Sequence, residues 1–225
     1  DIDAIKAAAT VNTVAILVEP IQGEGGVNVP ADDYLNQLRA LCDENDWLLM
    51  LDEIQTGNGR TGKFFAYQHN NILPDVVTTA KGLGNGVPIG ACLAQGKAAE
   101  ILQPGNHGST FGGNPLVCNA ALAATTALVE DKLIARAAHL GETLLNSFSD
   151  ALAGSKNVVD IRGKGLMIGI ELNRDCPELV AKAKARGLLL NVTAGSTVRL
   201  LPPLIISDQQ AQDIVQTVVA LISEF

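Results

Sequence analysis

Asp52 stands where an α/β protein binds its ligands. It follows the apolar run Trp47-Leu48-Leu49-Met50-Leu51, which lacks alternation and is typical of a parallel strand covered on both faces. Open α/β sheets bind ligands at the carboxyl ends of such strands. A carboxylate is costly to bury there unless a cation pairs with it. Asp52 is therefore either a helix cap or a loop ion pair, or an anion that receives a cationic ligand atom.

Lys81 is the second side chain that could carry chemistry. It follows the strand-like segment 75–80 and precedes Gly82-Leu83-Gly84-Asn85-Gly86. Backbone this rich in glycine lets a bulky ligand approach the lysine and permits turns with positive φ. The amine of such a lysine can form a Schiff base with a carbonyl compound. The alternative is a solvated surface lysine.

Residues 57–63 match two nucleotide-binding patterns only in part. Gly57-Asn58-Gly59-Arg60-Thr61-Gly62 satisfies G-x-G-x-x-G, and the addition of Lys63 satisfies G-x-x-x-x-G-K. The phosphate-loop pattern next needs Ser or Thr, where this chain has Phe64. The dinucleotide pattern needs a helix at once and an acidic residue about 20 positions on. We therefore expect these glycines to shape a loop beside Asp52 and not to bind a nucleotide.

Two further segments combine charge or hydroxyl groups with glycine. His107-Gly108-Ser109-Thr110-Phe111-Gly112-Gly113-Asn114-Pro115 suits an anion site, and equally a helix-capping turn with Asn114 as the cap and Pro115 in the first helical position. Glu24 lies on the glycine loop 22–26, and Arg199 lies in the segment 197–203. If the two meet, they form either a surface ion pair or a switchable receptor for a carboxylate.

The elements that position these residues alternate in the first half of the chain. Apolar runs predict strands at 14–18, 47–51, 76–77 and 89–93. Apolar residues at helical spacing predict a helix after a cap at Asp32 or Asp33; they are Tyr34, Leu35, Leu38, Leu41 and Cys42. Strand, helix and strand in this order indicate an α/β fold.

The order of the predicted helices and strands changes after Pro115. A helix is predicted at about 116–130, and a second helix follows it and ends at about 152. Two more helices are predicted at 178–186 and from 208 onward. Strands are predicted at 158–161, 166–172, 188–192 and 198–201. We therefore predict two domains, residues 1–120 and residues 121–225.

Composition excludes several classes of function. Sixteen Lys and Arg against 24 Asp and Glu give a net charge of −8, which leaves no cationic excess for binding a nucleic-acid backbone. The apolar fraction of 47% excludes a disordered chain. No apolar run approaches the ~18 residues of a membrane span. The four cysteines form no C-x-x-C pair, so we expect buried thiols in a reducing cytoplasm, with neither a disulfide frame nor a zinc site.

Taken in order, four motifs resemble the class III (ornithine-type) aminotransferases, which use pyridoxal phosphate (PLP). The motifs are Glu19-Pro20-Ile21-Gln22-Gly23-Glu24-Gly25-Gly26, Asp52-Glu53-Ile54-Gln55-Thr56-Gly57, Thr79-Ala80-Lys81-Gly82-Leu83-Gly84 and His107–Pro115. The resemblance implies PLP-dependent transferase fold type I: the latter part of the large parallel-sheet domain, plus an α+β C-terminal domain. It also implies a homodimer with its active site at the subunit interface.

The same resemblance implies a role for each site residue. Lys81 is the catalytic residue and carries PLP, and the other cofactor-binding residues are Asp52, Glu53, Ile54, Gln55 and Thr110. Ser109, Glu24 and Arg199 bind substrate, with Glu24 masking Arg199 in one half of the reaction. The implied substrates are N-acetylornithine and 2-oxoglutarate.

Other interpretations remain open at this point. The substrate could instead be succinylornithine, ornithine or 4-aminobutyrate; the chain could be a nucleotide-binding module built on residues 57–63, or an inert piece that only dimerises. The family's upstream half has no counterpart here, and the chain opens on Asp1 without an initiator Met. We therefore expect a fragment that binds PLP poorly and turns over little by itself.

Overall fold

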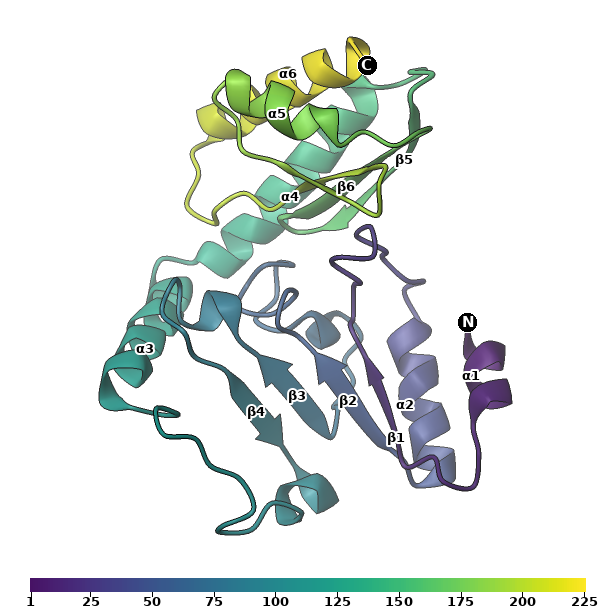
Figure 1. Cartoon of the computed structure of the whole chain (residues 1–225), viewed down its shortest axis with the longest axis vertical. Coiled ribbons are helices and arrows are strands. Elements are labelled where there is room, and N and C mark those ends of the chain that lie inside the picture. Colours follow the sequence, from purple (N-terminus) through teal and green to yellow (C-terminus); the bar gives the residue numbers. More distant parts are fainter. The chain divides into compact units, whose positions relative to one another are not determined.

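The computed structural model describes residues 1–225, which divide into two compact units (Figure 1). The N-terminal unit comprises residues 1–20, 30–58 and 65–128. The C-terminal unit comprises residues 21–29, 59–64 and 129–225. The predicted boundary at 120 and 121 falls inside the helix that spans 115–130, and the domain assignment stays a prediction.

The N-terminal unit is an α/β structure. Its helices and strands are α1 (Ile2–Ala8), β1 (Ala15–Val18), α2 (Tyr34–Asn45), β2 (Leu48–Asp52), β3 (Val76–Thr79), β4 (Ala91–Ala94) and α3 (Pro115–Glu130), whose last two residues are counted with the other unit. Three short 3-10 turns complete it: η1 (Ala66–His69), η2 (Lys81–Leu83) and η3 (Gly96–Glu100).

The sheet of this unit has the order β1-β2-β3-β4. β1, β2 and β3 pair in parallel, and β3 pairs with β4 antiparallel. Parallel neighbours need a crossover helix, and residues 80–90 are too few and too rich in turns to provide one, so β4 returns beside β3 in the opposite direction.

Helix α2 covers one face of this sheet. Leu35, Leu38, Leu41 and Cys42 are buried at the predicted spacing and pack with Leu49 and Leu51 of β2. Asp33 is the residue before the helix, but its carboxylate accepts a hydrogen bond from Gln37 Nε2 at 2.6 Å and caps no backbone N–H group. The opposite face of β2 is only half-buried, and β4 is exposed along its length.

The C-terminal unit is an α+β structure. It contains α4 (Leu133–Ala151), β5 (Val158–Lys164), β6 (Met167–Leu172), α5 (Glu178–Ala185), β7 (Asn191–Thr193), β8 (Thr197–Leu200) and α6 (Asp208–Ser223). The strands form an antiparallel sheet of order β5-β6-β8-β7. Phe148 of α4, Ile170 of β6 and Leu221 of α6 are among the buried side chains of its core.

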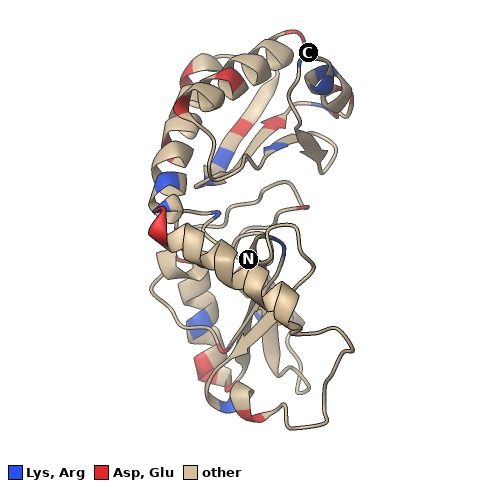
Figure 2. Cartoon of the chain, turned by 90° about the vertical axis from the view of Figure 1, so that its left-hand side faces the viewer, with Lys and Arg blue, Asp and Glu red and all other residues tan.

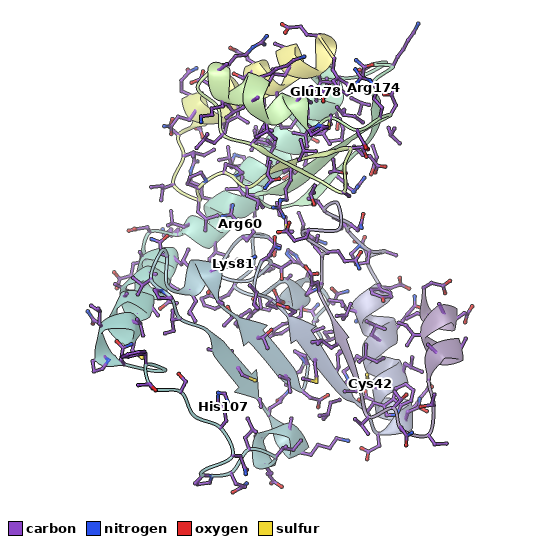
Figure 3. The ribbon with its side chains drawn as sticks, viewed as in Figure 1. Cys42, Arg60, Lys81, His107, Arg174 and Glu178 are labelled. Atoms are coloured by element: carbon purple, nitrogen blue, oxygen red, sulfur yellow. The ribbon has the colours of Figure 1, made fainter.

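Local contacts hold helix α6 at its start and just beyond its end. Ser207 caps α6 by accepting a hydrogen bond from the Gln210 N–H group at 3.1 Å. The guanidinium of Arg174 lies 3.5 Å from the centre of the Phe225 ring and pairs with Glu178 at 3.5 Å (Figure 3). The last residue of the chain is thereby held against the segment that precedes α5.

The cysteines are all free. Cys42 and Cys176 are buried as predicted, and burial raises the pKa of the Cys176 thiol to about 11. The prediction is wrong for Cys92 and Cys118, which are exposed, because β4 and the outer side of α3 have nothing packed on them. None of the helices combines the length and the apolarity that crossing a membrane would require.

Candidate active site

Asp52 lies at the carboxyl edge of the parallel strands, as predicted. It is the last residue of β2 and is in register with Thr78 of the neighbouring β3. One carboxylate oxygen, Oδ1, accepts the Ile54 N–H group at 3.0 Å. The other oxygen accepts no hydrogen bond from the chain, so Asp52 keeps one oxygen for a donor outside it.

Lys81 follows β3 and opens the 3-10 turn η2 (Figure 3). Its side chain is exposed in this unit, and its backbone has a left-handed φ of 44°. Adjacent strands are about 4.8 Å apart and three extended residues span about 10 Å, so at most about 15 Å separates the Cα atoms of Asp52 and Lys81. The two side chains therefore start close enough to reach opposite ends of one small ring.

Asn58 holds the backbone that leads into Lys81, and the sequence did not single it out for this. Its side-chain amide donates to Thr79 Oγ1 at 2.9 Å and to the Ala80 carbonyl at 3.3 Å. The side chain is 5% exposed, and its carbonyl oxygen Oδ1 is buried without a partner. Its place between Gly57 and Gly59 is a sequence signal that could have drawn attention to it, since asparagine is favoured at left-handed turn positions and its φ is 55°.

Glu53 points away from that edge into the unit. Its Oε2 accepts from Thr56 Oγ1 at 2.5 Å and from the Ala66 N–H group at 2.9 Å, and its Oε1 accepts from the Tyr67 N–H group at 2.9 Å. The side chain is fully buried, and this desolvation raises the pKa of Glu53 above its usual value although the hydrogen bonds oppose the shift. Glu53 thus fastens the loop after β2 to residues 66–67.

The glycine segment 57–63 lacks the features of a nucleotide site. Its amide groups at 57, 59 and 62 donate to the carbonyls of Glu53, Phe64 and Gly59. The next element along the chain is the four-residue turn η1, where both nucleotide patterns require a helix. Ile54 and Gln55 belong to the same turn-rich stretch directly after Asp52 and are half-buried.

Ser109 and Thr110 are exposed in the segment that precedes α3. Ser109 Oγ accepts the Gly112 N–H group at 2.9 Å, and Asn114 Oδ1 accepts the Val117 N–H group at 3.2 Å. The predicted helix cap at Asn114 with Pro115 in the first turn is therefore confirmed. His107 and Ser109 line an open hollow of about 610 Å³ in this unit.

Glu24 and Arg199 meet within the C-terminal unit, which the sequence alone could not show. The Arg199 guanidinium donates from Nη1 to Glu24 Oε1 at 2.8 Å. The Arg199 side chain is 7% exposed, whereas the Glu24 side chain is 69% exposed. A buried cation is thus covered by a carboxylate that faces solvent.

Arg60 is a half-buried cation that the sequence did not single out. Its Nη1 donates to the carbonyls of Leu166 at 3.1 Å and Pro202 at 2.6 Å. Burial lowers the pKa of Arg60 to about 10. These bonds hold residues 59–64 against the turn between β5 and β6, and Gly165 makes room for them because a Cβ there would lie 2.6 Å from the Arg60 carbonyl oxygen.

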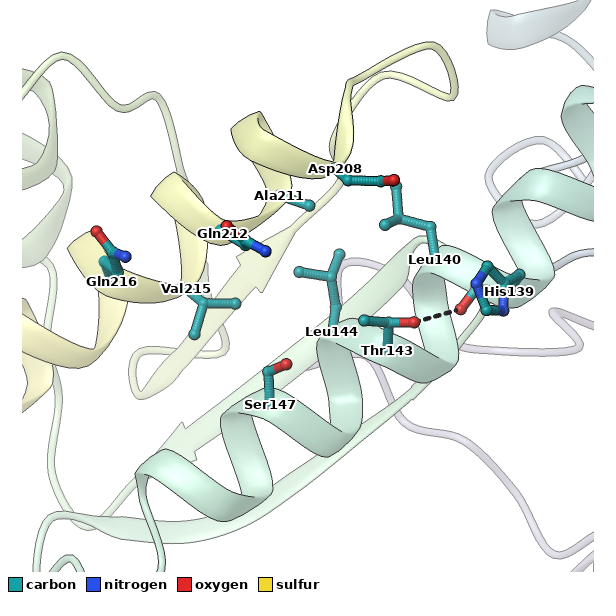
Figure 4. A pocket seen from close by; sticks show the side chains of 10 residues that line it. All are labelled: His139, Leu140, Thr143, Leu144, Ser147, Asp208, Ala211, Gln212, Val215 and Gln216. Atoms are coloured by element: carbon teal, nitrogen blue, oxygen red, sulfur yellow. Dashed lines mark hydrogen bonds between the residues drawn. The ribbon is translucent and has the colours of Figure 1, made fainter.

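A second hollow, of about 370 Å³, lies between α4 and α6 of the C-terminal unit (Figure 4). Exposed His139 and Thr143 of α4 line one side, and Asp208 and Gln212 line the other. None of the residues predicted to carry chemistry lines this hollow.

The comparisons with known proteins identify the family. The family model "Aminotransferase class-III" matches residues 1–222, so the chain belongs to the class III aminotransferases. The fold is accordingly that of the PLP-dependent aminotransferases, fold type I, as predicted.

Individual members of this family are highly similar to the chain in sequence and structure. The chain is 52% identical to an acetylornithine aminotransferase of Nitrosomonas europaea over its whole length, which is 58% of that protein. It also superposes on the acetylornithine aminotransferase of Elizabethkingia anophelis with a TM-score of 0.92 and 39% identity, covering 100% of this chain and 58% of the other. An ornithine aminotransferase of Toxoplasma gondii gives a TM-score of 0.94 and 40% identity over 100% of this chain and 55% of the other, and its structure is described as having partial occupancy of PLP at the active site. The chain thus spans somewhat more than half the length of its relatives.

Proposed function

We propose that the full-length protein containing these residues transfers the terminal amino group of N-acetylornithine to 2-oxoglutarate, giving N-acetylglutamate 5-semialdehyde and glutamate. This is a step of arginine biosynthesis. The observation that carries the proposal is the register of Asp52 with Thr78, which puts Lys81 two residues beyond the end of the neighbouring strand β3. Membership of the class III family and the acetylornithine aminotransferases among its relatives support the choice of reaction.

The residues at this edge suit PLP. The oxygen of Asp52 that accepts no hydrogen bond from the chain is an acceptor for a protonated ring nitrogen, and Lys81 provides an exposed primary amine next to glycine-rich backbone. Gln55 would donate to the phenolic oxygen of the ring, with Ile54 and Glu53 in the same loop. Thr110 would donate to the phosphate of the partner subunit's cofactor. When bound, PLP supplies an electron sink for the carbon that loses a proton.

Lys81 has two tasks in this proposal. It would hold the cofactor in the resting enzyme. Its Nζ atom would then serve as the base that takes the proton from the substrate carbon bearing the amino group, and as the acid that returns this proton. The exposed position of Lys81 on a turn between β3 and β4 leaves its side chain the freedom that both tasks need.

Arg199 and Glu24 would let one pocket accept two unlike substrates. Arg199 would bind the α-carboxylate of glutamate, Ser109 would lie near the substrate, and Glu24 would cover Arg199 when the acylated diamine is bound. The ion pair of 2.8 Å and the 69% exposure of the Glu24 side chain support this role, because the carboxylate can turn out into water while the buried Arg199 stays in place for a substrate carboxylate.

We further propose that the protein acts as a homodimer in the cytoplasm. Helix α3 carries no charged residue before Glu130 (Figure 2). Leu116 and Leu122 on this helix and Phe111 just before it are 76%, 63% and 81% exposed. An exposed apolar surface of this kind is typical of an interface, and four free cysteines suit a reducing compartment.

Steady-state rates of the full-length protein with N-acetylornithine, succinylornithine, ornithine and 4-aminobutyrate, each with 2-oxoglutarate, test the reaction. We expect the highest kcat/KM for N-acetylornithine. A clear preference for one of the other three would replace the substrate but keep the family. The proposal would be refuted if the protein bound PLP but transaminated none of these amines.

A further inference from the structure

The segment 21–29, which carries Glu24, is a small hairpin of the C-terminal unit. Gln22 and Asn28 exchange backbone hydrogen bonds of 3.2 and 3.1 Å across it. Ile21 and Val27 are buried with Met167 of β6. Val27 sits directly over Gly169, where a Cβ would lie 2.9 Å from the Val27 Cβ. The hairpin is therefore seated on the sheet of this unit.

Arg162 of β5 fastens the far side of this hairpin. Its Nε donates to the Val27 carbonyl at 2.9 Å and its Nη2 to the Gly26 carbonyl at 2.6 Å. Its Nη1 donates to Asp160 at 2.9 Å and to Glu171 at 2.6 Å. The two carboxylates fix the guanidinium on the sheet, so that its other nitrogens are aimed at the hairpin backbone.

A second fastening point lies at Glu24 itself. The hydroxyl of Thr193 in β7 donates to the Glu24 carbonyl oxygen. The main chain is thus held at residue 24 and again at residues 26 and 27. The Glu24 carboxylate, by contrast, faces solvent on one side and Arg199 on the other.

We infer that Arg162 is a positioning residue for substrate selection: by fixing the hairpin backbone it keeps the Glu24 carboxylate over Arg199, so that the covering group moves by side-chain rotation alone. This inference rests on the proposed role of Arg199 as the receptor of a substrate carboxylate. Without Arg162 the hairpin loses two backbone bonds, Glu24 covers Arg199 for less of the time, and a dicarboxylate competes for Arg199 more easily.

The test is the binding of glutarate, a dicarboxylate without an amino group, to the PLP-loaded full-length protein by titration calorimetry. We expect Arg162→Met to tighten the Kd about two- to fivefold, which is a change of about 1 kcal/mol or less in the free energy of binding. Glu24→Gln should tighten it in the same sense, and Arg162→Met should add nothing in the Glu24→Gln background. The KM for 2-oxoglutarate should fall in parallel.

Asp160→Asn is the matched control, because its amide oxygen can still accept from Arg162 Nη1, the pair with Glu171 remains and both hairpin bonds are left in place. The Kd of this variant should stay at the wild-type value. If Arg162→Met does not fold, Arg162→Lys should change the Kd for glutarate in the same direction but by a smaller factor. An unchanged Kd in the Arg162 variant, or an equal shift with and without Glu24, would overturn the inference. Glutarate binding that is insensitive to Arg199→Ala would instead refute the proposed role of Arg199.

Discussion

Replacing Glu53 with glutamine tests how the loop after Asp52 is held. The carboxylate of Glu53 accepts three hydrogen bonds, from Thr56, Ala66 and Tyr67. Glutamine has one side-chain oxygen. In its best orientation it keeps the bonds to Thr56 and Ala66 and turns its NH2 group against the Tyr67 N–H group, so that two donors face each other.

The size of the effect depends on that one lost bond. A buried N–H group without an acceptor costs about 1–3 kcal/mol. Removing a buried charge recovers part of the desolvation cost, which keeps the loss from exceeding that range. We therefore expect Glu53→Gln to lower the free energy of unfolding of the full-length protein by about 1–3 kcal/mol.

The pH dependence of this loss has a definite sign. Burial raises the pKa of Glu53 in the folded protein above its ordinary value of 4.5. The folded state therefore binds the proton more tightly than the unfolded state, and the contribution of Glu53 to stability falls as the pH rises from about 4.5 through the folded-state pKa. The glutamine variant lacks this dependence, so its deficit should grow as the pH is lowered from 7 toward 4.5.

The assay is urea unfolding followed by circular dichroism at several pH values, with the exposed Glu44→Gln as the control. Away from buried contacts such a change is worth no more than about 0.5 kcal/mol. A Glu53 variant as stable as the Glu44 variant would show that the buried carboxylate does not hold the loop. A deficit that shrinks toward acidic pH would show that the pKa shift has the opposite sign.

The other predictions concern backbone fit, the support of Lys81 and the apolar helix. Gly165→Ala should cost about 3 kcal/mol, since its Cβ would meet a backbone atom at 2.5 Å and this overlap adds to the strain of a positive φ. Gly154→Ala, at a similarly positive φ but in open space, should cost about 1–2 kcal/mol. Equal urea midpoints of the two variants would refute this difference. Asn58→Asp should destabilise more than Asn58→Ala, because a carboxylate would face the Ala80 carbonyl; the reverse order would count against the observed amide orientation. Leu122→Glu should convert the proposed dimer of the full-length protein to a monomer in sedimentation, because it puts a charge on the exposed apolar side of α3. An unchanged dimer mass would place the interface elsewhere.

The sequence predicts most of this fold because its signals are local. The spacing of Leu35, Leu38 and Leu41 predicts the buried face of α2, and Asn114 with Pro115 predicts the start of α3. The antiparallel direction of β4 was not predicted, because no feature of residues 91–94 differs from that of a parallel edge strand. Whether a strand runs parallel or antiparallel to its neighbour depends on the connection between the two strands.

The residues of the candidate site, like the elements of the fold, could be predicted where the sequence signal is local and were missed where it is not. Asp52 and Lys81 stand out because each follows an apolar strand, and the structure confirms that the two strands are neighbours. Asn58, Arg60 and Arg162 were missed because each acts on the site through bonds to backbone carbonyls, and no residue type in the sequence marks such an acceptor. The contact between Glu24 and Arg199 spans 175 positions, a separation at which no spacing rule applies.

The central claim of the proposed function is that the amine of Lys81 carries PLP. Incubating the full-length protein with PLP, reducing it with borohydride and mapping the modified peptide by mass spectrometry tests it directly. We expect the pyridoxyl label on Lys81, its loss together with the visible absorbance in Lys81→Ala, and its retention in Lys63→Ala. A label on Lys63 or any other lysine, or full absorbance in Lys81→Ala, would contradict the claim.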